Sequence, residues 1–129
     1  MKDTFHDNKA VQAIAPAVLA ANTNGVSIDL KGFDSALFVI NTGAIDAAGD
    51  FSVKLQESDT GTSGWTDVEA ADLLGSVPAT LAANAAYRIG YIGSKRKRYV
   101  RAVATKAGGT SIAAGVVAIL GHPNIAPVA

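Results

Sequence analysis

Ile112 to Leu120 (IAAGVVAIL) and Ser35 to Asn41 (SALFVIN) are short stretches in which apolar residues occupy odd and even positions alike. Successive side chains of a β-strand point to opposite faces of its sheet. A strand that is apolar at both parities is therefore covered on both faces, and the β-branched residues of these stretches favour strands. We expect the two stretches to form central strands that carry the core.

Two further stretches alternate between apolar and polar residues, which predicts strands with one buried face and one face in water. They are Val26 to Leu30 (VSIDL) and Phe51 to Glu57 (FSVKLQE). Two more strand-like runs, Tyr87 to Ile92 and Arg98 to Thr105, flank the polar segment Gly93 to Lys97. That arrangement predicts a hairpin.

A helical signal occurs in Val68 to Leu74 (VEAADLL), which is followed by Gly75 in the position that commonly ends a helix. Because short strands recur between Gly, Asn and Asp turns and crossover helices are missing, the pattern favours a sandwich over a parallel α/β sheet. We predict an all-β fold, an antiparallel, jelly-roll-like β-sandwich of about seven or eight strands, with one short helical turn and extended terminal arms.

The chain of 129 residues fits a single domain. Residues 23–121 are expected to form the sandwich core. Residues 1–22 are expected to form an N-terminal arm and a short edge strand, because Pro16 interrupts an otherwise Ala-rich stretch, and residues 122–129 a C-terminal tail. The chain has no cysteine, so disulfides cannot contribute to its stability.

Charge is distributed unevenly along the chain although the net charge is zero. All eleven acidic residues lie in residues 1–72, which contain four basic residues, whereas residues 73–129 have seven basic residues and no acid. Such asymmetry is typical of a surface that meets a charged partner, including another copy of the chain. It fits equally well with strands from the two halves that interleave and pair their charges within one subunit.

The sequence offers few candidates for catalysis. The two histidines, His6 and His122, lie near the two ends without clustered ligands, and most aspartates occupy turn positions, where they bond the local backbone. Gly90 to Lys95 (GYIGSK) does not have the glycine spacing of a phosphate-binding loop, and no helix follows it. We expect a protein that is not an enzyme, with no catalytic residue, no metal site and no cofactor.

Neither a secretory signal nor a membrane span is expected. Met1 to Asn8 is polar, and Ser111 to Gly121 is shorter than the about 20 residues that cross a bilayer. We expect a soluble protein made in the cytoplasm, with no membrane partner.

Lys95, Arg96, Lys97 and Arg98 form a basic cluster, with Tyr99 and Arg101 just beyond it. A solvated hairpin tip is the simplest interpretation, and docking on an acidic protein surface is the next. Nucleic acid could bind through phosphate contacts and base stacking, but the net charge of zero disfavours this partner.

Tyr87 to Val103 (YRIGYIGSKRKRYVRAV) and Val117 to Pro123 (VAILGHP) resemble small structural proteins encoded in the head-gene modules of tailed bacteriophages and prophages. Phe51 to Trp65 (FSVKLQESDTGTSGW) is similar to the same group, in which a strand ending in Glu-Ser-Asp runs through a Gly turn to Trp. The resemblance covers most of the chain and rests on motifs of the fold.

The resemblance implies a head decoration, or cement, protein, made in the cytoplasm of the host bacterium and located on the outside of the capsid in the virion. Such a protein is often a homotrimer that stabilises the capsid by bridging copies of the major capsid protein. We expect the N-terminal arm and the basic hairpin to make these contacts. The candidate interface residues are Phe5, Val11, Ile14, Lys95, Arg96, Lys97, Arg98 and Arg101.

Two alternatives stay open. One is a carbohydrate-binding β-sandwich module, for which the candidate aromatic residues are Trp65, Tyr87, Tyr91 and Tyr99. The other is a head-completion or tail component, since the same group includes such proteins. A hydrolase is disfavoured for the reasons given above.

Overall fold

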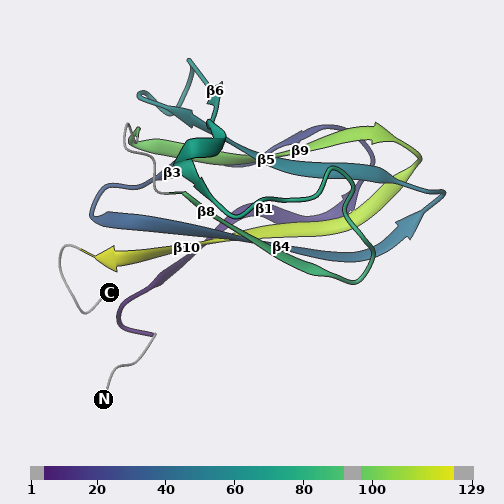
Figure 1. Cartoon of the computed structure of the whole chain (residues 1–129), viewed down its shortest axis with the longest axis horizontal. Helices are drawn as coiled ribbons and strands as arrows, with labels where there is room; N and C mark the ends of the chain where they lie inside the picture. The colour runs from purple at the N-terminus through teal and green to yellow at the C-terminus, as the bar shows by residue number, and fades with distance from the viewer. Residues whose placement is uncertain (1–4, 92–96, 124–129) are drawn as a thin grey trace.

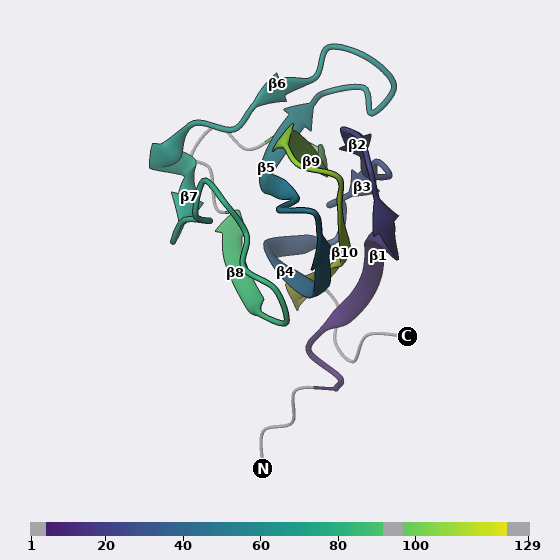
Figure 2. The same ribbon diagram turned by 90° about the vertical axis from the view of Figure 1, so that its right-hand side faces the viewer.

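The computed structural model describes residues 5–91 and 97–123, and nearly all of their regular structure is β-strand. Two antiparallel sheets face each other across a hydrophobic core (Figure 1, Figure 2). No helix in the described residues is long and apolar enough to span a bilayer.

We name the two sheets after a central strand of each. The β10 sheet contains, in spatial order, β1 (Lys9–Leu19), β10 (Ser111–Pro123), β4 (Phe33–Asp46), β8 (Ala86–Tyr91) and β7 (Leu73–Leu74). The β9 sheet contains β2 (Thr23–Asn24), β9 (Tyr99–Gly108), β5 (Asp50–Ser58) and β6 (Thr66–Asp67), and β3 (Ile28–Asp29) also pairs with β9.

The chain crosses repeatedly between the two sheets. It starts in the β10 sheet with β1, crosses to β2 and β3, returns with β4, crosses to β5 and β6, returns with β7 and β8, and crosses once more to β9 before ending in β10. The resulting strand orders, β1-β10-β4-β8 against β2-β9-β5-β6, are those of a jelly roll. The predicted antiparallel, jelly-roll-like sandwich is therefore confirmed.

The two apolar stretches form the centre of the β10 sheet. SALFVIN lies in β4 and IAAGVVAIL lies in β10, and the two strands pair from Phe33 opposite Pro123 to Asp46 opposite Ser111. One face of each strand is buried in the core. The core side chains of β10 are Ile112, Ala114, Val116, Ala118 and Leu120.

The region expected to be an arm with a short edge strand contains a longer strand. β1 has eleven residues and pairs with β10 from Lys9 opposite Leu120 to Leu19 opposite Ile112. Pro16 lies where the register shifts between Ile14 and Ala17. Proline is tolerated there because an edge strand needs no N–H at a shift in its pairing.

The helical signal of Val68 to Leu74 is expressed only as a 3₁₀ turn, Ala70–Asp72, followed by β7. The turn buries none of its residues, so no packing extends it into a longer helix. The predicted short helical turn is confirmed.

A buried hydrogen bond joins the two sheets near one end of the sandwich. The hydroxyl of Tyr91, on β8, donates to a carboxylate oxygen of Glu57, on β5, over 2.7 Å. The same hydroxyl accepts the backbone N–H of Lys97 at 3.1 Å. Tyr91 has no exposed surface and Glu57 is 9% exposed, so neither group can exchange this partner freely for water.

We predict that Tyr91→Phe lowers the free energy of unfolding by about 1–3 kcal/mol, because it leaves a buried carboxylate without this donor. Tyr87→Phe is the matched control: the Tyr87 hydroxyl accepts the N–H of Ala82 at an exposed site, and its loss should cost less. Urea unfolding of the two variants measures the difference. Equal costs would contradict the prediction.

A strained turn connects β4 to β5. Ala47 and Ala48 have φ angles of 47° and 57°, and the N–H of Gly49 donates to the carbonyl of Asp46 over 3.2 Å. Positive φ at both central positions defines a type I′ turn, in which alanine is disfavoured because its Cβ crowds the backbone. The turn is formed at a cost that the packing of the sandwich offsets.

We predict that Ala48→Gly raises the free energy of unfolding by about 0.5–1 kcal/mol, since glycine adopts the left-handed conformation without that crowding. Ala86→Gly, in an ordinary strand position of β8, should instead destabilise the fold by a similar amount. Thermal unfolding of both variants distinguishes relief of strain from a general effect of glycine.

Candidate functional site

The outer face of the β10 sheet is built from side chains that point away from the core. Strand register places these residues in rows across β1, β10, β4 and β8, with Leu74 of β7 opposite Gly90. We name this surface the apolar face, and it comprises Ala10, Gln12, Leu37, Val39, Asn41, Gly43, Leu74, Ala86, Arg88, Gly90, Ala113, Gly115, Val117 and Ile119.

The apolar face is divided into a part with large side chains and a part with small ones. Register aligns Ile119 with Leu37, and Val117 with Val39, so large aliphatic groups lie side by side. Further along the strands, Gly115 is aligned with Asn41. The face is thus raised over one half of the sheet and lower over the other.

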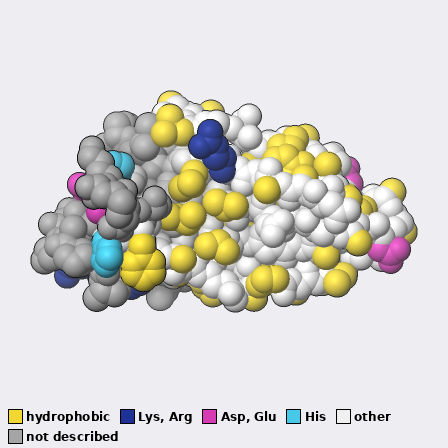
Figure 3. Space-filling model, turned by 90° about the horizontal axis from the view of Figure 1, so that it is seen from below, with side chains coloured by type: hydrophobic (Ala, Val, Ile, Leu, Met, Phe, Trp, Pro, Cys, Tyr) yellow, Lys and Arg dark blue, Asp and Glu magenta, His cyan; other side chains and the backbone are white. Residues whose placement is uncertain are grey.

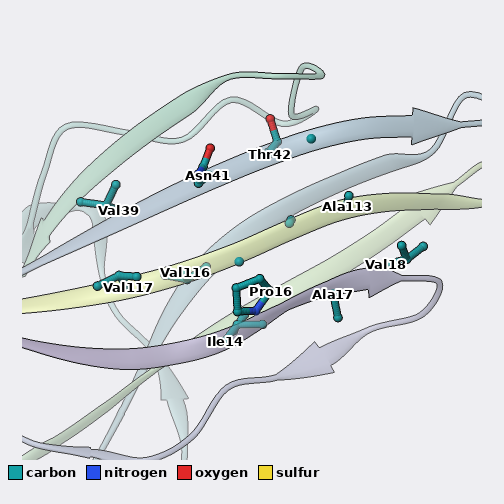
Figure 4. A pocket seen from close by; sticks show the side chains of 13 residues that line it. Ile14, Pro16, Ala17, Val18, Val39, Asn41, Thr42, Ala113, Val116 and Val117 are labelled. Atoms are coloured by element: carbon teal, nitrogen blue, oxygen red, sulfur yellow. The ribbon is translucent and has the colours of Figure 1, made fainter.

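A groove of about 570 Å³ occupies the lower half, bounded by residues of β1 on one side and of β4 on the other (Figure 4). Glycine at position 115 lets β1 approach closely, since a Cβ there would lie 3.1–3.3 Å from Pro16. Asn41 and Thr42 provide polar groups along one wall. The Thr42 hydroxyl is already engaged, because it donates to the carbonyl of Ala82 at 2.6 Å.

The apolar face carries almost no charge. Arg88 is its only ionisable residue, and no Asp or Glu belongs to it. Figure 3 shows this side of the molecule, where apolar and uncharged groups cover the middle of the surface and acidic side chains lie towards the right-hand end. Two of its large side chains are well exposed, Val117 at 41% and Leu74 at 57%.

The outer face of the β9 sheet is polar and internally bonded. The Arg101 guanidinium lies 4.4 Å from the ring centre of Trp65 and donates to the side-chain oxygen of Gln56 at 2.7 and 3.0 Å. Gln56 in turn donates to Asp67 at 2.9 Å, and Lys54 also binds Asp67. These bonds lower the pKa of Asp67 below its ordinary value. The hydrogen bond from Gln56 has the largest effect, and the one from Lys54 has the next largest.

The described part of the basic cluster is paired within the chain. Arg98 donates from Nε and Nη2 to the two carboxylate oxygens of Asp29, at 2.9 and 2.8 Å. Lys97 lies 3.8 Å from Asp59. Both pairs join the acidic and basic halves of the sequence, which supports charge pairing within a subunit at these positions. Lys95 and Arg96 lie outside the described residues.

The three predicted interface residues of the N-terminal region have different surroundings. Phe5 is 80% exposed, whereas Val11 packs partly against the core and Ile14 is only 5% exposed. Of the three, Phe5 is thus the side chain that is open to a partner.

The four aromatic residues considered for carbohydrate binding do not form an open platform. Tyr91 is fully buried, and Arg101 covers Trp65. Tyr99 lies against Arg98, with the ring centre and the guanidinium carbon 5.1 Å apart, and Tyr87 is half-buried. The described residues contain no group of three or more His, Cys, Asp and Glu side chains that could hold a metal ion.

The apolar face was not predicted from the sequence, although the sequence contains a signal for it. IAAGVVAIL and SALFVIN are apolar at both parities, which predicts cover on both sides of the strands. Within the described chain the core covers one side, and the other side is the apolar face.

Neither a protein-family model nor a curated protein matches this sequence. Among solved structures, the fold is similar to that of the SPBc2 prophage-derived protein YomS, with a TM-score of 0.52 and 12% identity over 93% of this chain and 97% of that chain. It is also similar to VP2 of the infectious bursal disease virus subviral particle, with a TM-score of 0.50 and 9% identity over 89% of this chain and 32% of VP2. At these identities the likeness shows a common fold.

The ion pair of Asp29 and Arg98 predicts a dependence of stability on pH. The hydrogen bond from Arg98 lowers the pKa of Asp29 from 3.8 to about 2. Because the pKa is lower in the folded state, the contribution of this carboxylate is complete above about pH 4 and is lost as the pH falls towards 2.

We predict that Asp29→Asn and Arg98→Gln each reduce the fall in melting temperature between pH 4 and pH 2, and that the double variant reduces it no further. Melting temperatures measured by circular dichroism across this range test the pair. A fall as steep as that of the unmodified protein would show that other carboxylates dominate acid unfolding.

Proposed function

We propose that this chain is a structural protein of a tailed bacteriophage particle that binds the outer surface of the capsid and stabilises it by bridging major capsid protein subunits. The observation that carries the proposal is a jelly roll that occupies nearly the whole chain and is similar, over 93% of this chain, to the fold of a prophage-derived protein. The resemblance of Tyr87 to Val103 and Val117 to Pro123 to phage head-module proteins supports the same assignment.

The likeness to VP2 gives independent support of the same kind. The chain matches about a third of VP2, a protein whose structure was solved as a viral subviral particle. Sandwiches of this type are frequent in viral shells because their two sheets form a rigid block with loops and faces free for contacts. The capsid exterior is the proposed location of this chain.

The described structure suits a role in binding better than one in chemistry. Polar groups on the β9 sheet bond each other, and the groove on the β10 sheet is lined mostly by aliphatic residues. A capsid-binding protein needs no catalytic group or cofactor, because modest contacts repeated over a lattice add up to strong attachment. We accordingly propose a non-enzymatic role, with the major capsid protein as partner and a homotrimer as the assembly.

The N-terminal residues ahead of β1 are the proposed contact with the capsid. β1 starts at Lys9, which is paired with Leu120, so residues 1–8 can be removed without loss of a strand pair. Phe5 lies in this segment and exposes 80% of its surface.

The test uses capsids purified from the phage or prophage that encodes the chain, stripped of this protein and then incubated with purified variants. Deletion of residues 1–8 or Phe5→Ala should lower apparent affinity by at least about tenfold, the effect expected for loss of one buried aromatic side chain. Val26→Ala, at another exposed apolar residue, should bind like the unmodified chain.

Cryo-electron microscopy of the rebound particles gives the location. Density on the outer surface of the shell is the expected result. Density confined to the neck or tail would replace the decoration role with that of a head-completion or tail component, and absence of the chain from particles would overturn the proposal.

A further inference from the structure

We propose that copies of this chain associate through the apolar face, so that a second copy of the chain covers the outer side of the β10 sheet. The inference goes beyond the capsid role and does not depend on it. The apolar face would hold copies of the chain together in the absence of capsids.

The composition of the central strands is the first argument. Residues that point outward from a solvated sheet are normally polar, as they are on the β9 sheet of this chain, where Lys54, Gln56 and Arg101 occupy such positions. The corresponding positions of β4 and β10 carry Leu37, Val39, Val117 and Ile119. This pattern is that of a strand buried on both faces.

The size of the face is the second argument. Strands rise about 3.3 Å per residue and lie about 4.8 Å apart, so each outward residue covers about 32 Å² and the fourteen residues of the apolar face present on the order of 450 Å². A standard interface buries about 800 Å² on each partner. The apolar face alone therefore supplies more than half of the area of a stable interface, and Val18, 70% exposed beside the groove, extends it.

The charge of the face indicates which partner covers it. With Arg88 as its only charged residue, the face has no charge pattern that a differently charged partner would match. Burial of the face against the uncharged surface of a neighbouring copy, as around the axis of the proposed homotrimer, removes few polar groups from water, which is the situation at permanent homo-oligomer interfaces.

The capsid is a less suitable partner for this surface. The chain folds before it meets any capsid, and an exposed apolar patch of several hundred Å² on a free chain is a liability for aggregation. A second copy is present from the moment of synthesis and covers the patch at once. The capsid contact is then left to other surfaces, such as the segment around Phe5.

The shape of the face is the third argument. Its raised half carries Leu37, Val39, Val117 and Ile119, and its lower half holds the groove floored by Ala113 and Gly115 (Figure 4). Because the same surface has a ridge and a groove, the large side chains on the ridge of one copy can fill the groove of a second copy. Small residues along the groove, such as Ala113 and Gly115, allow close approach of the two sheets.

The test is sedimentation equilibrium of the purified full chain without capsids. The unmodified protein should be oligomeric. Val117→Lys places a charge in the raised half of the face, and Asn41→Lys places one at an exposed position beside the groove; each should weaken self-association by at least about tenfold, because burial of an unpaired charge is costly.

Thr105→Lys is the matched control, since Thr105 pairs with Ser52 on the outer face of the β9 sheet and its replacement should leave the oligomer intact. Circular dichroism confirms that each variant is folded, and the exposed Asn41 position keeps the test valid if Val117→Lys fails to fold. A monomeric unmodified protein, or oligomers that persist in the folded lysine variants, would overturn the inference.

The outcome is separable from that of the capsid experiment. Oligomers that do not bind capsids would remove the decoration role and leave the interface standing. Capsid binding by a monomer would support the decoration role and rule out the proposed interface between copies.

Discussion

The structure depends on the pairing of β4 with β10. These two strands lie at the centre of one sheet and are joined along eleven registered positions from Phe33 and Pro123 to Asp46 and Ser111. β1 is added on the outer side of β10, β8 is added on the outer side of β4, and the inward side chains of both central strands form about a third of the core. The alternation of side chains along this pair also creates the apolar face, so core and candidate interface arise from one constraint.

The two outer faces of the sandwich differ in a way that suggests separate roles. On the β9 sheet, Trp65, Arg101, Gln56 and Asp67 bond one another and leave a polar surface suited to water. On the β10 sheet, aliphatic residues surround a groove and almost no charge is present. A sandwich with one wet face and one apolar face is a natural building block for an assembly, because its orientation towards neighbours follows from its chemistry.

Acidic and basic residues that are far apart in sequence meet where the two halves of the chain interleave. Arg98 binds Asp29 through two hydrogen bonds, and Lys97 approaches Asp59. Much of the charge asymmetry in these positions is therefore satisfied inside the subunit, which reduces what the described basic residues can offer to a partner. Phe5 and the exposed residues of the apolar face are therefore better candidates for contacts with a partner than the described basic residues.

The fold class and the central strands follow from the amino-acid sequence alone, because turn residues and the alternation of apolar residues act locally and leave a direct trace in the order of amino acids. The sequence also contained the sign of a second buried face, in the apolar residues at both parities of IAAGVVAIL and SALFVIN. Three facts became known only from the three-dimensional structure: the core covers a single side of these strands, Ile14 is buried, and Arg98 is bound by Asp29. Those facts depend on which strands become neighbours, and strand neighbours are set by long-range pairing that no local pattern encodes.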